Sequence, residues 1–188
     1  RDSPIRLPVC GHWYCKECGE RLRQSSSSPE TCPECREPLP LGPDQLFDSA
    51  GQKYLRVERQ VDRLGGGWSK LPRALQREMD EVRELLEQAA DQGLAAAKNN
   101  LAFMYAYGQG VAQSYVKARD WAEQAAEGGL ADAQCAIGAY YHSGHEGVAI
   151  DLPRARMWNE KAAAQGHAGA QFNLGKKHHD RQRGPPDF

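Results

Sequence analysis

The sequence has 188 residues, and its 24 lysines and arginines nearly balance its 25 aspartates and glutamates, for a formal net charge of −1. The length allows one ordinary domain or two small ones. The balanced charge argues against nucleic-acid binding as the main role, because such proteins carry a basic excess. No run of residues approaches the roughly 18 apolar residues of a membrane-spanning helix. The sequence therefore predicts no nucleic-acid partner and no membrane segment.

A cluster of cysteines occupies the amino-terminal part of the chain, where five of the six cysteines lie. Two Cys-x-x-Cys pairs are separated by thirteen residues, and a further cysteine and a histidine precede the first pair. Thiolates and a neutral imidazole are ligands of tetrahedral zinc, which would supply the folding energy that so short a segment cannot obtain from a core. Free or disulfide-paired cysteines in a loop are the alternative. The candidate zinc ligands are Cys10, His12, Cys15, Cys18, Cys32 and Cys35.

These residues resemble the last six of the eight ligand positions in RING zinc fingers, over about residues 5–40. The resemblance implies a small α+β module in which ligand pairs alternate between two zinc ions. The first Cys-x-x-Cys pair of that family has no counterpart in Arg1–Val9, so we expect the chain to start partway through the domain. The resemblance then implies one complete site, made by Cys10, His12, Cys32 and Cys35, and one half-present site with Cys15 and Cys18.

The same cysteines also fit a single zinc, as in treble-clef or ribbon modules. In that case Cys10 and His12 would not bind the metal. A single-zinc site does not require the spacing of these two residues, so the spacing favours the RING pattern. The ligands of that single site would be Cys15, Cys18, Cys32 and Cys35.

The RING resemblance implies a ubiquitin-protein ligase, or a ligase subunit, without a nucleophile of its own. It would dock a ubiquitin-conjugating enzyme and catalyse the transfer by positioning. The residues expected to contact that enzyme or ubiquitin are Leu22, Pro33 and Arg36. The alternative is a non-catalytic scaffold in which the zinc module only mediates assembly. The clustering of five cysteines in one short segment argues against a secreted disulfide scaffold, and we expect the protein in the cytoplasm or the nucleus.

Two amphipathic helices are predicted after the cysteine cluster. The proline-rich stretch Pro38–Pro43 marks a boundary, and residues 41–84 are predicted to be a linker that contains these helices. Apolar positions three and four residues apart predict one helix over 44–64, which three glycines end. A second helix is predicted from an N-cap at Ser69 to a C-cap at Gly93.

A motif recurs three times in the remainder of the chain. Glu-x-Ala-Ala-x-x-Gly occurs at 87–93, 123–129 and 160–166, with offsets of 36 and 37 residues, and leucine, tyrosine, tryptophan and alanine positions recur in step with it. A period of this length predicts an all-α solenoid of helix-turn-helix repeats. Trp121 and Trp158 recur at one position and are therefore predicted to be core residues. The predicted fold is thus a RING-like α+β module followed by an all-α solenoid.

The repeating units resemble Sel-one-like repeats, relatives of the tetratricopeptide repeats, over residues 85–180. A last helix is predicted over 168–180, and residues 181–188 are predicted to be a disordered tail. The resemblance implies an adaptor that presents a helical surface to a substrate or partner protein. On the first helix of each repeat, residues that differ between repeats are the better candidates for contact. The predicted partner surface comprises Lys98, Asn99, Phe103, Gln134 and Ala139.

Overall fold

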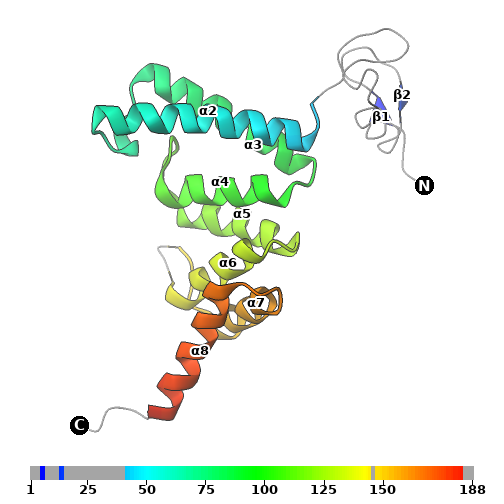
Figure 1. The fold of residues 1–188 in the computed structure, drawn as a ribbon, viewed down its shortest axis with the longest axis vertical. Helices are drawn as coiled ribbons and strands as arrows, with labels where there is room; N and C mark the ends of the chain where they lie inside the picture. Colours follow the sequence, from blue (N-terminus) through cyan, green and yellow to red (C-terminus); the bar gives the residue numbers. More distant parts are fainter. Residues whose placement is uncertain (1–4, 7–12, 15–40, 145–146, 184–188) are drawn as a thin grey trace.

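The computed structural model describes residues 5–6, 13–14, 41–144 and 147–183. Helices dominate this part of the chain and stack in pairs along the long axis of the molecule (Figure 1). This arrangement confirms the predicted all-α solenoid. The helices are α2 (Pro43–Leu64), α3 (Arg73–Asp91), α4 (Ala95–Tyr107), α5 (Tyr115–Glu127), α6 (Ala131–Ser143), α7 (Leu152–Ala164) and α8 (Ala168–Arg183), with a short 3-10 helix at Trp68–Lys70.

The amino-terminal segment contributes two short strands. β1 (Ile5–Arg6) pairs antiparallel with β2 (Trp13–Tyr14), and Ile5 lies opposite Tyr14. All six predicted zinc ligands lie outside the described residues, as do the predicted conjugating-enzyme contacts Leu22, Pro33 and Arg36. The zinc sites and the rest of the RING-like module therefore stay predictions.

The helix predicted over 44–64 is confirmed as α2. Pro43 occupies the first turn, where its missing N–H costs no hydrogen bond. The backbone N–H of Gly42 donates to Gln45 Oε1 at 3.0 Å, which satisfies a donor at the helix start. The helix ends at Gly65, which adopts a left-handed conformation with φ of 61° that glycine enters without steric cost.

The predicted start of the next helix at Ser69 is wrong, because α3 begins at Arg73. Leu71 has extended backbone angles, φ −72° and ψ 140°, as expected of a residue that precedes a proline. Pro72 therefore separates the short 3-10 helix from α3. The predicted C-cap is off by one residue: α3 stops at Asp91 with Gln92 as its C-cap, and Gly93 follows with a positive φ of 93°.

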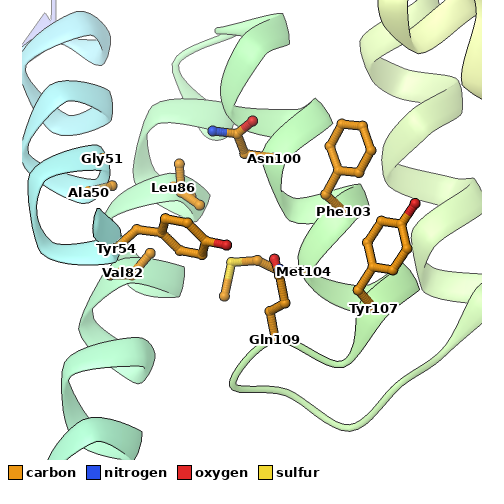
Figure 2. Close-up of a pocket in the computed structure, with 10 residues that line it drawn as sticks. All are labelled: Ala50, Gly51, Tyr54, Val82, Leu86, Asn100, Phe103, Met104, Tyr107 and Gln109. Atoms are coloured by element: carbon orange, nitrogen blue, oxygen red, sulfur yellow. The ribbon is translucent and has the colours of Figure 1, made fainter. Parts of the chain in front are cut away.

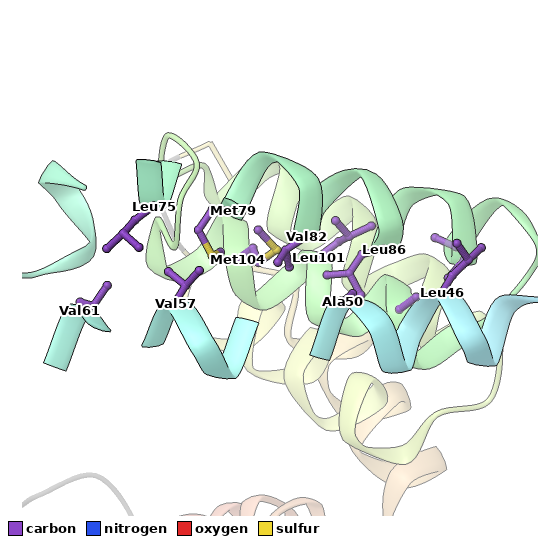
Figure 3. Close-up of a cluster of buried hydrophobic side chains, with 13 residues drawn as sticks. Leu46, Ala50, Val57, Val61, Leu75, Met79, Val82, Leu86, Leu101 and Met104 are labelled. Atoms are coloured by element: carbon purple, nitrogen blue, oxygen red, sulfur yellow. The ribbon is translucent and has the colours of Figure 1, made fainter. Parts of the chain in front are cut away.

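The first hydrophobic core joins α2, α3 and α4 (Figure 3). Apolar residues of α2 and α3 face each other and also meet Leu101 and Met104 of α4. The segment predicted as a linker with amphipathic helices is thus a helix pair that belongs to the same core as the first repeat. Its buried apolar residues are Leu46, Ala50, Val57, Val61, Leu75, Met79, Val82, Leu86, Ala89 and Ala90.

The second core lies between the α4–α5 and α6–α7 pairs and is built largely from alanines, which let helices approach closely. Ile137 is fully buried there, as its counterpart Leu101 is in the first core. Trp158 is buried in the second core, and Trp121 packs against both cores. The prediction that these tryptophans are core residues is confirmed.

Helix α8 begins at Ala168, as predicted, but continues to Arg183. Residues 181–183 are therefore helical, and the prediction of a disordered tail from residue 181 is wrong for these three. The helix packs against α7, and Ala170 is fully buried in that contact.

Candidate protein-binding groove

A groove with a volume of about 300 Å³ opens between α2 and α4, the first helices of two successive pairs (Figure 2). It exists because α4 packs mainly on α3 and α5, so that α2 and α4 stand apart. Helix α3 supplies the floor through Val82 and Leu86, which are both buried. The complete lining consists of Ala50, Gly51, Tyr54, Val82, Leu86, Asn100, Phe103, Met104, Tyr107 and Gln109.

Gly51 makes the α2 wall shallow. A Cβ atom added at this glycine would have no neighbour within 4 Å, so the space above it is open. A glycine inside a helix costs stability relative to alanine, roughly 0.5–1 kcal/mol. The missing side chain at Gly51 therefore widens the groove, and no neighbouring helix packs closely against this position.

Two aromatic residues of α4 form the opposite wall. Phe103 is 43% exposed and Tyr107 is 66% exposed. Their rings stack with centroids 6.1 Å apart and planes 7° from parallel, as residues four positions apart on a helix can. The stack holds both rings in place and leaves apolar surface open to solvent beside the groove.

Tyr54 brings a third aromatic ring from α2. Its ring stacks on Trp68 with centroids 5.6 Å apart, and its hydroxyl donates to Glu58 Oε1 at 3.4 Å. Burial, followed by the neighbouring Glu58 carboxylate, raises the pKa of Tyr54, so the hydroxyl stays neutral. The ten lining residues include no aspartate, glutamate, lysine, arginine or histidine, and the groove lining therefore carries no charged side chain.

A further tyrosine, Tyr140 on α6, is partly buried against the second core. Burial raises the pKa of Tyr140 to about 12, and Tyr107 and Tyr115 are close enough to add to this effect. Aromatic side chains of this kind dominate the energetics of protein interfaces.

Comparison with known proteins identifies the helical part of the chain. The family model described as Sel1 repeat matches residues 83–94, 95–130 and 131–167. The solved structure of a Sel1 repeat protein from Oxalobacter formigenes is 34% identical, with a TM-score of 0.51, and the match covers 71% of this chain and 95% of that one. The chain belongs to the Sel1-repeat family. Proteins with Sel1 repeats bind protein partners, and this Sel1-repeat chain is a helical protein–protein interaction scaffold.

A second solved structure has a similar fold. It is c5321, a protective antigen of uropathogenic Escherichia coli strains that displays an SLR fold, and it is 25% identical to the Sel1-repeat chain with a TM-score of 0.53. The match covers 87% of this chain and 33% of c5321. No curated protein matches the sequence. The RING resemblance of the amino-terminal segment finds no support in these comparisons, which favour the scaffold over the ligase.

Only part of the predicted partner surface of the Sel1-repeat protein is exposed to solvent, where a partner could contact it. Phe103 lines the groove and is exposed. Ala139 is exposed on α6, and Lys98 is half-buried on α4. Of the predicted set, the structure thus brings only Phe103 into the groove.

The predicted partner surface is wrong for Asn99 and Gln134, because their exposed fractions are only 8% and 5%. Asn99 occupies the repeat position of Cys135, whose thiol on α6 contacts Asn173 Nδ2 of the next first helix at 3.8 Å, so this position faces the following repeat. Gln134 donates from Nε2 to Ala126 O at 3.1 Å and accepts from Gln165 Nε2 at 2.8 Å. Both side chains serve contacts within the solenoid, and neither can contact a partner.

Sequence reasoning missed Tyr54, Asn100 and Tyr107 of the groove. Tyr54 was overlooked because α2 lacks the repeat motif and was predicted as part of a linker. Asn100 and Tyr107 differ from their counterparts in the next repeat, Ala136 and Ser143, so the same criterion that selected Phe103 could have found them.

The described helices of the Sel1-repeat protein offer neither a membrane span nor a metal site. Among its described helices, none is both long and apolar enough to cross a membrane. In the same part of the chain, no group of three or more histidine, cysteine, aspartate or glutamate side chains could hold a metal ion. The predicted zinc ligands of the amino-terminal segment lie outside this part of the chain.

Proposed function

We propose that this Sel1-repeat protein is an adaptor that binds a segment of a partner protein in the groove between α2 and α4. The observation that supports the proposal is the exposed aromatic stack of Phe103 and Tyr107 beside the apolar floor. Interface hot spots are enriched in tyrosine and cluster around pockets that exclude water. The groove combines these features on one face of the scaffold.

Alanine substitution of the aromatic stack is expected to weaken partner binding strongly. Phe103→Ala and Tyr107→Ala should each lower the affinity about 30-fold, the equivalent of a hot-spot residue worth about 2 kcal/mol. The partner would be isolated on the intact protein, and its affinity for each variant would be measured with purified components by titration calorimetry. Equal affinity of the wild type and the double variant would contradict the proposal.

Two matched variants separate loss of the site from loss of the fold. Phe172→Ala removes a phenylalanine that is 69% exposed on α8, far from the groove, and should leave the affinity unchanged. Gly51→Leu should block binding by filling the open space above α2. Because leucine is a better helix former than glycine, this variant should keep or increase the melting temperature while it loses the partner.

We also propose that the amino-terminal cysteines and His12 bind zinc, with the spacing of these ligands as the support. His12→Ala is expected to release zinc from the complete site, because three thiolates alone leave its tetrahedral coordination open. Elemental analysis of reduced, purified protein measures the zinc content. Cys135→Ser, which changes the one cysteine outside the cluster, is the control and should keep all zinc. An unchanged content in the His12 variant would instead support a single site of four cysteines.

A further inference from the structure

A cluster of cationic side chains surrounds the turn between α2 and α3. Residues 56–77 contain six lysines and arginines but only two acidic residues, Glu58 and Asp62. Arg56 Nε lies 3.9 Å from Glu78 Oε2, which is too far for a hydrogen bond. The other five cations are exposed, and within the part of the chain that the structure describes none of them forms an ion pair or a hydrogen bond. These five residues, which we call the basic tip, are Arg59, Arg63, Lys70, Arg73 and Arg77.

The basic tip projects beyond the helices of the repeats. Helices α4 to α7 have 13 residues each, whereas α2 has 22 and α3 has 19. In the 36-residue register of the repeats the start of α5 at Tyr115 corresponds to Met79, but α3 already begins at Arg73. At 1.5 Å per residue this extension adds about 9 Å, and Figure 1 shows the turn of the α2–α3 pair reaching past the end of α4.

The extension is held together by apolar contacts of its own. Val57 and Val61 of α2 and Leu75 of α3 are buried there and belong to the first core. Trp68 in the turn stacks on Tyr54. The cations of the basic tip take no part in these contacts, so folding does not explain their number.

An apolar side chain lies at the end of the basic tip. Leu64, the last residue of α2, is 63% exposed. A Cβ atom added at Gly65 or Gly66 would meet no atom within 4 Å, so the turn beside Leu64 is open. An apolar group among lysines and arginines is the combination that binds at the interface of an anionic bilayer, because the headgroups attract the cations and the acyl chains accept the apolar atoms.

The charge of the helix pair is divided between its two ends. Away from the turn, residues 78–91 hold six acidic residues and one arginine, and residues 43–52 hold two acidic residues and no lysine or arginine. A negatively charged surface attracts the basic tip and repels this acidic end. Such a surface would therefore orient the molecule with the tip toward it, although the whole chain has a net charge of −1.

We propose that the basic tip binds the surface of a membrane that contains anionic lipids, with its guanidinium groups on the headgroups and Leu64 at the boundary of the acyl chains. The planar guanidinium of arginine forms paired hydrogen bonds with phosphate and carboxylate oxygens. A projecting tip fits a flat lipid surface, and an exposed leucine gains nothing from the phosphate backbone of a nucleic acid. The contact is peripheral, because none of the described helices can span a membrane. The proposal does not depend on the proposed function of the groove.

Co-sedimentation of the intact protein with lipid vesicles tests the proposal. Vesicles of phosphatidylcholine with about one-third phosphatidylserine should bind the protein, and vesicles of phosphatidylcholine alone should not. Binding should weaken as sodium chloride is added, because salt screens the attraction. The double variant Arg73→Gln/Arg77→Gln should lower the partition coefficient about 30-fold, or about 2 kcal/mol for the loss of two cations near an anionic surface.

The double variant Arg154→Gln/Arg156→Gln is the matched control. It removes the same amount of charge from exposed positions on α7 and should leave vesicle binding unchanged. Leu64→Ala should weaken binding about tenfold, because less apolar surface enters the bilayer, and should keep the circular dichroism spectrum of the wild type. Phe103→Ala should bind vesicles as the wild type does, so the basic tip and the groove are tested separately.

Three results would overturn the proposal: equal binding to the two kinds of vesicle, no binding to either, or equal losses in the two double variants. Retention of the protein on heparin, a soluble polyanion, without any binding to vesicles would also overturn it. That result would assign the basic tip to an acidic macromolecule and leave the proposed function of the groove standing.

Discussion

Replacement of Leu101 by alanine is expected to lower the free energy of unfolding by about 2–5 kcal/mol. Leu101 is fully buried where α4 meets α2 and α3, so the substitution removes apolar contacts and leaves a cavity that the neighbouring helices fill only in part. Chemical denaturation followed by circular dichroism at 222 nm measures the change.

Leu64→Ala is the matched control for this substitution. Leu64 ends α2 and is 63% exposed, so the same chemical change should shift the free energy of unfolding by no more than about 0.5 kcal/mol. Equal losses for the two variants would contradict the packing of α4 into the first core.

Replacement of Gly110 by alanine is expected to cost about 2–5 kcal/mol of stability, from two sources. Gly110 has φ of 70°, and a left-handed conformation costs a residue with a Cβ about 1–2 kcal/mol. The added Cβ would also lie 2.5 Å from Met79 Cβ on α3, and overpacking of this kind costs about 1–3 kcal/mol. Thermal and chemical denaturation measure the sum.

Gly129→Ala separates the two sources. Gly129 also has a positive φ, 89°, but a Cβ added there would have no neighbour within 4 Å. This variant should lose only the backbone contribution of about 1–2 kcal/mol. If both variants lost the same amount, the close approach of the α4–α5 turn to Met79 would be refuted.

The repeat architecture could be predicted from the sequence because its signal is redundant. The Glu-x-Ala-Ala-x-x-Gly motif ends α3, α5 and α7, and a three-fold recurrence at 36 and 37 residues leaves one stacking arrangement. Helix α2 has no such support. Its amphipathic pattern predicted a helix but not the helices against which it would pack, so its part in the first core became known only from the structure.

The groove could not be predicted, because it depends on how far apart two helices stand. Tyr54 and Phe103 are distant in the sequence and share the groove only because α2 and α4 both pack on α3. Variation between repeats is also ambiguous as a criterion. It selects Phe103, which is exposed, and equally Asn99, which is buried.

The family match begins at residue 83, so α2 lies entirely outside the recognised repeats although it forms one wall of the groove. In the proposed function, ligand choice would therefore be shared between α2 and the repeat helix α4. A chimera that keeps residues 73–183 but carries another amphipathic helix in place of α2 should retain the solenoid and acquire a different ligand preference. The selectivity of the proposed groove would thus be open to redesign at the junction between α2 and the repeats.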